Sequence, residues 1–185
     1  MNITEIIAVV FSLICVILTI KRNILCWPTG LVAVAAYAIV FFDVKLYADL
    51  GLQAVFFFQG IYGWWYWKKA DEGNPPPITK LTPMDWRIYA QWFVLVYFAV
   101  VMALKIFTDS NVIFVDTFVA TGSLIANLML AHKKLESWKL WIIVDVVYVC
   151  LFLYKGLYMS SVLYLIFLGM AINGLISWKK AYEKI

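Results

Sequence analysis

Seven long apolar stretches, separated by short polar segments, dominate this sequence. Each is close to the ~20 residues that a helix needs to cross the hydrocarbon core of a bilayer. The chain of 185 residues is 65% hydrophobic and 14% charged, whereas a soluble globular domain is about half apolar and a quarter charged. The composition therefore excludes a water-soluble fold. We expect an all-α integral membrane protein with seven transmembrane helices, at residues 3–20, 25–42, 46–67, 88–107, 112–131, 138–154 and 158–178.

The basic residues fall unevenly on the two sides of this predicted membrane protein. Lys45, Lys105 and Lys155 lie on one side, and the other twelve Lys and Arg residues lie on the other. Because basic residues concentrate in cytoplasmic loops, we expect the N-terminus outside and the C-terminus inside. The same asymmetry accounts for the net charge of +4, so we expect no nucleic-acid partner.

The chain matches itself without a gap when it is shifted so that Trp67 falls on Trp178, and the tetrapeptide Trp-Lys-Lys-Ala stands at both places. We call this shift the repeat offset. We predict a first three-helix bundle at residues 1–70, a cytoplasmic linker and linking helix at 71–111, and a second three-helix bundle at 112–185. Three spans and a linking helix return the chain to its starting side. The bundles are therefore expected to be parallel repeats in a 3+1+3 arrangement, as in SWEET transporters, which bind substrate at the repeat interface.

Asp145 is the clearest candidate for a functional residue, because it is an acidic side chain near the middle of a predicted span. A charge there costs ~2.5–3.5 kcal/mol on insertion scales, and the equivalent position of the first repeat is Val34. Helical spacing places four aromatic residues on the face of Asp145: Trp138, Trp141, Tyr148 and Phe152. An acid among aromatic rings suits an aromatic organic cation. The alternative is a structural Asp bonded to a neighbouring hydroxyl or backbone group.

Two further sets of polar residues are candidates for the same site. One face of the fifth predicted span carries Asp116, Ser123 and Asn127, with Thr117 and Thr121 beside them. Such a stripe either lines a substrate pathway or joins helices through hydrogen bonds. The third span carries Gln53 and Gln59, and neither has an amide at its repeat partner. This asymmetry favours one ligand site rather than two.

Nothing in the sequence indicates catalysis. It contains one His and no GxSxG, HExxH or Walker motif. We therefore expect a protein that is not an enzyme and has neither cofactor nor metal. His132 is expected in a solvated loop at the cytoplasmic edge, and Lys155 in an interfacial or salt-bridge role.

Three segments carry a resemblance to the PnuC-type vitamin transporters. They are residues 46–48, Leu-Tyr-Ala; residues 53–64, with three consecutive Phe; and Trp138-x-x-Trp141-x-x-x-Asp145, which fits the family's WxxWxxx(N/D) signature. The resemblance covers nearly the whole chain. It implies a multi-pass protein of the bacterial inner membrane, a homotrimer, and facilitated diffusion drawn inward by a cytoplasmic vitamin kinase.

The family carries nicotinamide riboside, thiamine or related vitamins, and its nicotinamide riboside branch usually has Asn at the position of Asp145. A carboxylate can accept a hydrogen bond from an aminopyrimidine, so we expect thiamine, with nicotinamide riboside as the alternative. The substrate is expected between the bundles, enclosed by Trp138, Trp141, Asp145, Tyr148, Gln53, Gln59, Ser123 and Asn127. A different class of protein also stays open, namely the substrate-binding membrane subunit of an ATP-driven vitamin importer.

Overall fold

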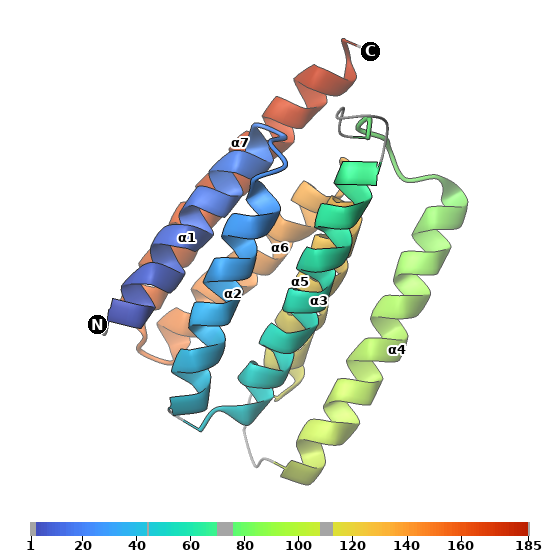
Figure 1. Cartoon of the computed structure of the whole chain (residues 1–185). Coiled ribbons are helices and arrows are strands. Elements are labelled where there is room, and N and C mark those ends of the chain that lie inside the picture. Colours follow the sequence, from blue (N-terminus) through green and yellow to red (C-terminus); the bar gives the residue numbers. More distant parts are fainter. Residues whose placement is uncertain (1–2, 44, 70–75, 108–112, 185) are drawn as a thin grey trace. The chain divides into compact units, whose positions relative to one another are not determined.

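The computed structural model describes residues 3–43, 45–69, 76–107 and 113–184 (Figure 1). Within these ranges the chain forms seven helices: α1 (Ile3–Ile20), α2 (Cys26–Asp43), α3 (Tyr47–Lys69), α4 (Pro83–Phe107), α5 (Ile113–Ala131), α6 (Ser137–Tyr154) and α7 (Tyr158–Tyr182). The predicted all-helical fold and the number of helices are confirmed. Residues 70–75, where the predicted cytoplasmic linker begins, and residues 108–112, which include its end, lie outside the described residues.

Five of the described helices, α1, α2, α5, α6 and α7, are long and apolar enough to cross a membrane. This finding supports a multi-pass membrane protein. The crossings predicted for α3 and α4, and the outside position of the N-terminus, stay predictions. Helix α3 is less apolar because it carries Gln53 and Gln59 and ends in two lysines.

Helix α4 begins five residues before the stretch predicted from hydrophobicity, because a capping box starts it. The backbone N–H of Thr82 donates to an Asp85 carboxylate oxygen at 3.0 Å, and the Asp85 N–H donates to the Thr82 hydroxyl at 3.1 Å. Lys134, in the turn before α6, pairs with the same carboxylate at 2.9 Å. A search for apolar residues alone misses this polar first turn.

Helix bounds recur at the repeat offset found in the sequence. Helices α2 and α6 both contain 18 residues, and they start at the equivalent positions Cys26 and Ser137. Helices α3 and α7 also start at equivalent positions, Tyr47 and Tyr158. The two halves of the sequence therefore fold into the same local elements, while the parallel arrangement of the two bundles stays a prediction.

The turns after the first two helices of each repeat also match. Left-handed backbone conformations occur at Arg22 (φ 60°) and Lys133 (φ 52°), and again at Lys45 (φ 60°) and Gly156 (φ 73°). At each of these four helix ends, the residue after the left-handed one donates its backbone N–H to the carbonyl of the residue five positions before it, at 2.8 to 2.9 Å. This pattern is the Schellman helix ending. Three of the four positions are basic residues rather than glycine, so the backbone pattern persists where the side chain does not favour it.

One tryptophan in each repeat packs flat against a glycine. A Cβ atom added to Gly63 would lie 2.2 to 2.5 Å from three ring atoms of Trp27, and one added to Gly174 would lie 2.6 Å from three ring atoms of Trp138. Both tryptophans are buried. The two pairs are equivalent under the repeat offset, and in each pair only a residue without a side chain fits beneath the ring.

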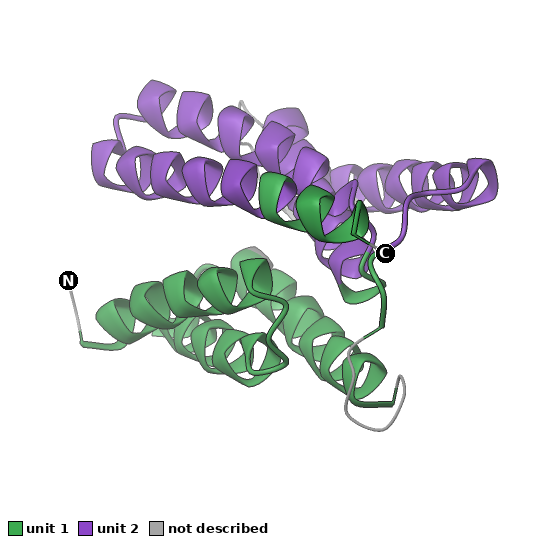
Figure 2. Ribbon diagram, turned by 90° about the horizontal axis from the view of Figure 1, so that it is seen from above, with its two compact units in different colours: residues 1–78, 131–133, 176–185 green, residues 79–130, 134–175 purple. Residues whose placement is uncertain are grey.

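The chain divides into two compact units (Figure 2). Unit 1 comprises residues 1–78, 131–133 and 176–185, and unit 2 comprises residues 79–130 and 134–175. In unit 1, α1 packs on α2 and α2 packs on α3. These units follow contacts rather than sequence similarity, so the division by repeats predicted above stays a prediction.

In unit 2, α4 packs against α5 and is anchored to the turn that precedes α6. Tyr89 of α4 shares a buried cluster with Ile125 and Met129 of α5. In the segment before α4, the backbone N–H of Leu81 donates to a Glu136 carboxylate oxygen at 3.0 Å. These contacts fix α4 to the helices that carry most of the candidate site.

Candidate substrate site

Asp145 stands at the middle of α6 and is 3% exposed. No described residue gives its carboxyl group a hydrogen bond or an ion pair. A buried charge without a partner costs several kcal/mol, and ionisable groups at membrane depth mark substrate or ion sites by default. The alternative interpretation, a structural Asp bonded to a neighbouring hydroxyl or backbone group, has no such bond among the described residues.

A cluster of four aromatic rings on α6 and α7 begins one helical turn after Asp145. Tyr148 stacks on Phe152 with ring centroids 5.5 Å apart, and Tyr164 of α7 lies 4.4 Å from Tyr148 and 5.2 Å from Phe152. Phe167 closes the group at 5.7 Å from Tyr164. Residues three apart on a helix share a face, so Tyr148 belongs to the face of Asp145. We call Tyr148, Phe152, Tyr164 and Phe167 the aromatic cluster.

The sequence interpretation did not select Tyr164 and Phe167 as site residues. Tyr164 was visible only as the repeat partner of Gln53. Tyr37 stacks on Phe41 at 5.9 Å in the first repeat, as Tyr148 does on Phe152, so the stack is common to both repeats. Within the aromatic cluster, the tyrosine at position 164 is the member that the first repeat lacks.

The two tryptophans of the signature have different surroundings. Trp138 is buried over Gly174, in the same way as Trp27 lies over Gly63. Helix packing is therefore enough to account for Trp138, and its predicted stacking on a substrate stays a prediction. Trp141 is only partly buried and packs against the apolar cluster of α5 and α6, so its ring is the more available of the two.

The polar face of α5 contains both satisfied and unsatisfied hydroxyls. Ser123 donates to the carbonyl of Val119 at 2.8 Å, within its own helix. The hydroxyls of Thr117 and Thr121 are fully buried and have no partner among the described residues. Helix α5 approaches α6 closely at Gly122, where an added Cβ would lie 2.7 Å from Val144. The threonines are thus better placed than Ser123 to donate to a ligand.

The predicted site residues are divided between the two units. Six of them, Trp138, Trp141, Asp145, Tyr148, Ser123 and Asn127, belong to unit 2. Gln53 and Gln59 belong to unit 1, where both are half-buried on α3. A single site formed by all eight residues stays a prediction.

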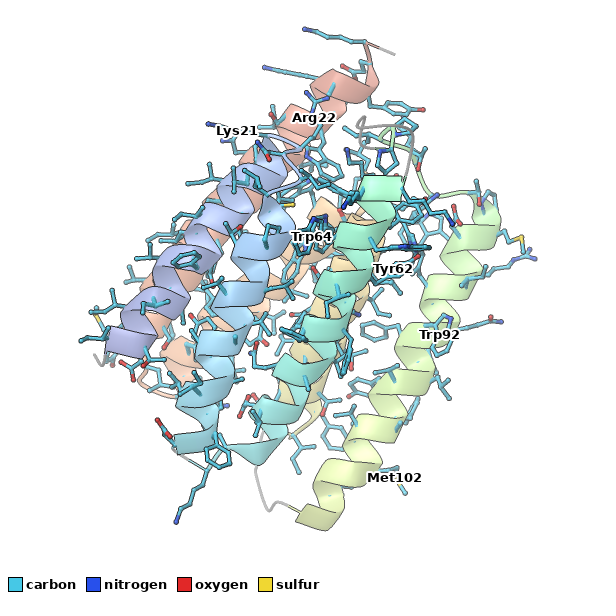
Figure 3. All side chains as sticks on the ribbon, viewed as in Figure 1. Lys21, Arg22, Tyr62, Trp64, Trp92 and Met102 are labelled. Carbon is cyan, nitrogen blue, oxygen red and sulfur yellow. The ribbon has the colours of Figure 1, made fainter. Side chains whose placement is uncertain are left out.

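His132 lies in the turn after α5, as predicted, but its ring is half-buried rather than solvated. Its ring is hydrogen-bonded to the hydroxyl of Tyr62 at 2.8 Å, and it meets the rings of Tyr62 and Tyr66 edge-on at 5.6 and 5.4 Å. Tyr62 is marked on α3 in Figure 3. The sequence placed His132 beside two lysines and so suggested a solvated loop, but α3 covers it with two tyrosines four residues apart.

The prediction for Lys155 is confirmed, because its ammonium group contacts both carboxylate oxygens of Asp116, at 2.9 and 3.2 Å. Asp116 thus differs from Asp145 in having a cationic partner. In the described ranges, no three His, Cys, Asp or Glu residues lie together as they would to hold a metal ion.

Residues 2–180 match the sequence profile described as "Nicotinamide mononucleotide transporter". The chain belongs to this family. The predicted PnuC-type identity is thereby confirmed, and the inner membrane predicted as its location is consistent with membership of this bacterial transporter family.

Curated relatives are similar over most of their length. The nicotinamide riboside transporter PnuC of Escherichia coli is 26% identical, with 94% of this chain and 84% of the relative covered. PnuC of Neisseria mucosa is 24% identical (96% and 72% covered), and the riboflavin/roseoflavin transporter RibM of Streptomyces davaonensis is 23% identical (91% and 81% covered). These relatives are transporters, which agrees with the prediction that the chain is not an enzyme.

A crystal structure of the vitamin B3 transporter PnuC has the same fold. It superposes with a TM-score of 0.79 at 22% identity, covering 98% of this chain and 82% of the other. The likeness establishes the PnuC fold for this chain.

Proposed function

We propose that this protein takes up a vitamin that contains a cationic aromatic ring, and that nicotinamide riboside is its substrate. The observation that carries the proposal is the buried carboxyl group of Asp145, which lacks a partner among the described residues of a transporter-family chain. A ligand with a positive ring would supply the missing countercharge.

The aromatic cluster suits the same ligand. A pyridinium ring can stack on Tyr148 or Tyr164, and its charge is attracted to the faces of aromatic rings. Ribose hydroxyls need both donors and acceptors, and the buried hydroxyls of Thr117 and Thr121 can serve as either. Recognition would thus combine one charge pair, ring stacking and a few neutral hydrogen bonds.

Nicotinamide riboside replaces thiamine as our preferred substrate. The relatives described above are named as transporters of nicotinamide riboside or of riboflavin and roseoflavin. None of them supports the thiamine prediction. A flavin ring is neutral, so a buried carboxylate offers riboflavin no charge pair. Thiamine stays the second candidate because of one observation: position 145 is Asp, and a carboxylate can accept from the amino group of its pyrimidine.

We further propose facilitated diffusion by rocking of two parallel repeats, with the N-terminus outside. The recurrence of helix bounds and turns at the repeat offset supports the repeats, and the basic residues gathered on one side support the orientation. The homotrimer and the trapping of substrate by a cytoplasmic kinase rest on the family resemblance alone.

Calorimetric titration of the purified protein with nicotinamide riboside, thiamine and riboflavin tests the proposal. We expect binding of nicotinamide riboside, and a loss of at least tenfold in affinity for Asp145→Leu, since a charged partner of a buried group contributes ~1.5–3 kcal/mol. Asp116→Asn is the matched control, because it removes a carboxylate that already has a partner. Its affinity should equal that of the parent.

Three outcomes separate the alternatives. Thiamine binding that Asp145→Asn abolishes, with no binding of the riboside, would make thiamine the substrate. Equal affinity in the parent and in Asp145→Leu would remove Asp145 from the site. Binding without uptake by the reconstituted protein alone would favour the substrate-binding subunit of an ATP-driven importer.

A further inference from the structure

Two tryptophans make reciprocal hydrogen bonds between the two repeats, within unit 1. They lie at the end of the molecule where α3 and α7 finish in paired lysines, Lys68–Lys69 and Lys179–Lys180, which we call the lysine-rich end. The indole N–H of Trp67, at the end of α3, donates to the carbonyl of Ala131, at the end of α5, at 2.9 Å. The indole N–H of Trp178, in α7, donates to the carbonyl of Thr19, at the end of α1, at 3.1 Å. Both rings are buried. Each repeat therefore provides the donor for a carbonyl of the other.

The Trp67 bond satisfies the carbonyl of Ala131, which has no other hydrogen bond among the described residues, whereas the carbonyl of Thr19 also accepts from the backbone N–H of Arg22 at 2.9 Å. The last four carbonyls of a helix have no intrahelical donor, and both acceptors lie in the last turn of their helices. Trp67 and Trp178 are also equivalent under the repeat offset, and their acceptors lie one position away from equivalence. Two equivalent side chains thus make the same bond in opposite directions.

Trp67 is held by further contacts. The ammonium group of Lys133 lies 4.2 Å from the centre of its ring, and Trp27 meets it edge-on at 5.5 Å. One and a half turns earlier on α3, Tyr62 is bonded to His132. The end of α3 is therefore joined to the turn between α5 and α6 by an indole bond, a cation–π contact and a Tyr–His bond.

A transporter that works by rocking of its repeats must separate them at the end where substrate leaves. This inference rests on the proposed function, because a contact between repeats has a gating role only if that end opens. We propose that Trp67 and Trp178 form a two-point latch that holds the lysine-rich end shut, and that opening for release breaks both indole bonds. The strength of a single neutral hydrogen bond suits this role, since it changes an open-to-closed ratio by about two- to tenfold.

Cys26 is a native reporter of the latch. It is the first residue of α2 and is buried. Its carbonyl accepts from the thiol of Cys15, one turn before Thr19 on α1, at 3.1 Å, and its neighbour in sequence, Trp27, meets the ring of Trp67 edge-on at 5.5 Å. It is therefore linked to the Thr19 end of α1 through Cys15 and to Trp67 through Trp27. A buried structural thiol is inert to alkylating reagents, so its alkylation rate follows the fraction of molecules in which the latch is open.

The experiment measures alkylation of Cys26 by N-ethylmaleimide in membrane vesicles, in a variant whose other two cysteines are replaced by Ser. We expect Trp67→Phe and Trp178→Phe each to raise the rate by about two- to tenfold, and the double variant to multiply the two effects. Trp64→Phe is the matched control. It changes an indole of the same helix that is 41% exposed (Figure 3), and its rate should equal that of the parent.

Lys133→Met keeps both indole bonds and removes only the cation above Trp67. It gives a second measurement if a Phe variant does not fold, and its rate should lie between those of the parent and Trp67→Phe. Rates equal to that of the parent in the folded Phe variants and in Lys133→Met would overturn the latch. Because alkylation needs no substrate, faster alkylation in a protein that transports none of the three vitamins would refute the proposed function and leave the latch standing.

Discussion

Adding one methyl group at Gly63 should destabilise the protein, whereas the same change at Gly51 in the same helix should not. A Cβ atom at Gly63 would stand 2.2 Å from the ring of Trp27, and nothing lies within 4 Å of one at Gly51. The ring has little room to move, because it is buried and its edge rests on Trp67. The contrast isolates the contact from the general effect of alanine in a helix.

The magnitude follows from two opposing terms. Overpacking of a core costs ~1–3 kcal/mol, and alanine is favoured over glycine inside a helix by ~0.5–1 kcal/mol. Gly63→Ala should therefore lower the free energy of unfolding by roughly 0.5–2 kcal/mol, which is about 1–8 °C in the unfolding midpoint at this chain length. Gly51→Ala should raise the midpoint by about 1–4 °C. In α7, Gly174→Ala and Gly169→Ala should show the same contrast.

The assay is thermal unfolding in detergent, followed by tryptophan fluorescence. Trp27→Phe provides the rescue, since its indole N–H has no partner among the described residues and the smaller ring leaves room for the methyl group. Combined with Gly63→Ala, it should lose less stability than the sum of the two single changes. Equal midpoints for Gly63→Ala and Gly51→Ala would refute the Trp–Gly contact.

Three further predictions concern charged groups at or near the ends of helices. Burial and the neighbouring Arg22 lower the pKa of Lys133 from 10.5 to about 8. Between these pH values the unfolded chain holds the proton and the folded chain does not, so the stability of the fold should rise with increasing pH across that window. In Lys133→Met, the unfolding midpoint should depend less on pH over the same window. Hydrogen bonds from the backbone N–H of Thr82 and from Lys134 lower the pKa of Asp85 from 3.8 to about 2. The ionised Asp85 carboxylate therefore stabilises the fold, and this stabilisation should be lost as pH falls from 3.8 to about 2. The stability of Asp85→Asn should not show this loss over the same pH range. The ion pair between Lys155 and Asp116 is about one-third exposed. Lys155→Met should therefore change the thermal unfolding midpoint by about 2 °C or less. A drop of about 6 °C would show that the pair stabilises the fold more than its exposure predicts.

The helices of this protein could be predicted from the sequence because their signal is local. Apolar stretches of membrane length indicated all seven helices, and the repeat offset predicted the equivalence of α2 with α6 and of α3 with α7. The start of α4 was missed because it depends on a hydrogen-bonded capping box between Thr82 and Asp85 rather than on hydrophobicity. A Thr-x-x-Asp pattern was present in the sequence and could have indicated it.

The candidate site could be predicted only in part. Asp145 stood out because an acid in an apolar stretch is rare, and the structure buries it one helical turn before the aromatic cluster. Tyr164 and the covering of His132 could not be predicted, because each depends on contacts between helices that are distant in sequence. Repeat equivalence was the one available signal, because the two repeats differ at Gln53 and Tyr164, and an asymmetric pair is what the proposal of a single ligand site requires.

Uptake of labelled nicotinamide riboside into liposomes that contain only this protein tests the central claim most directly. The account predicts uptake that saturates with substrate, falls at least tenfold in Asp145→Leu and is unchanged in Asp116→Asn. Uptake that is unaffected by Asp145→Leu, or liposomes that take up none of the riboside while the protein remains folded, would contradict it.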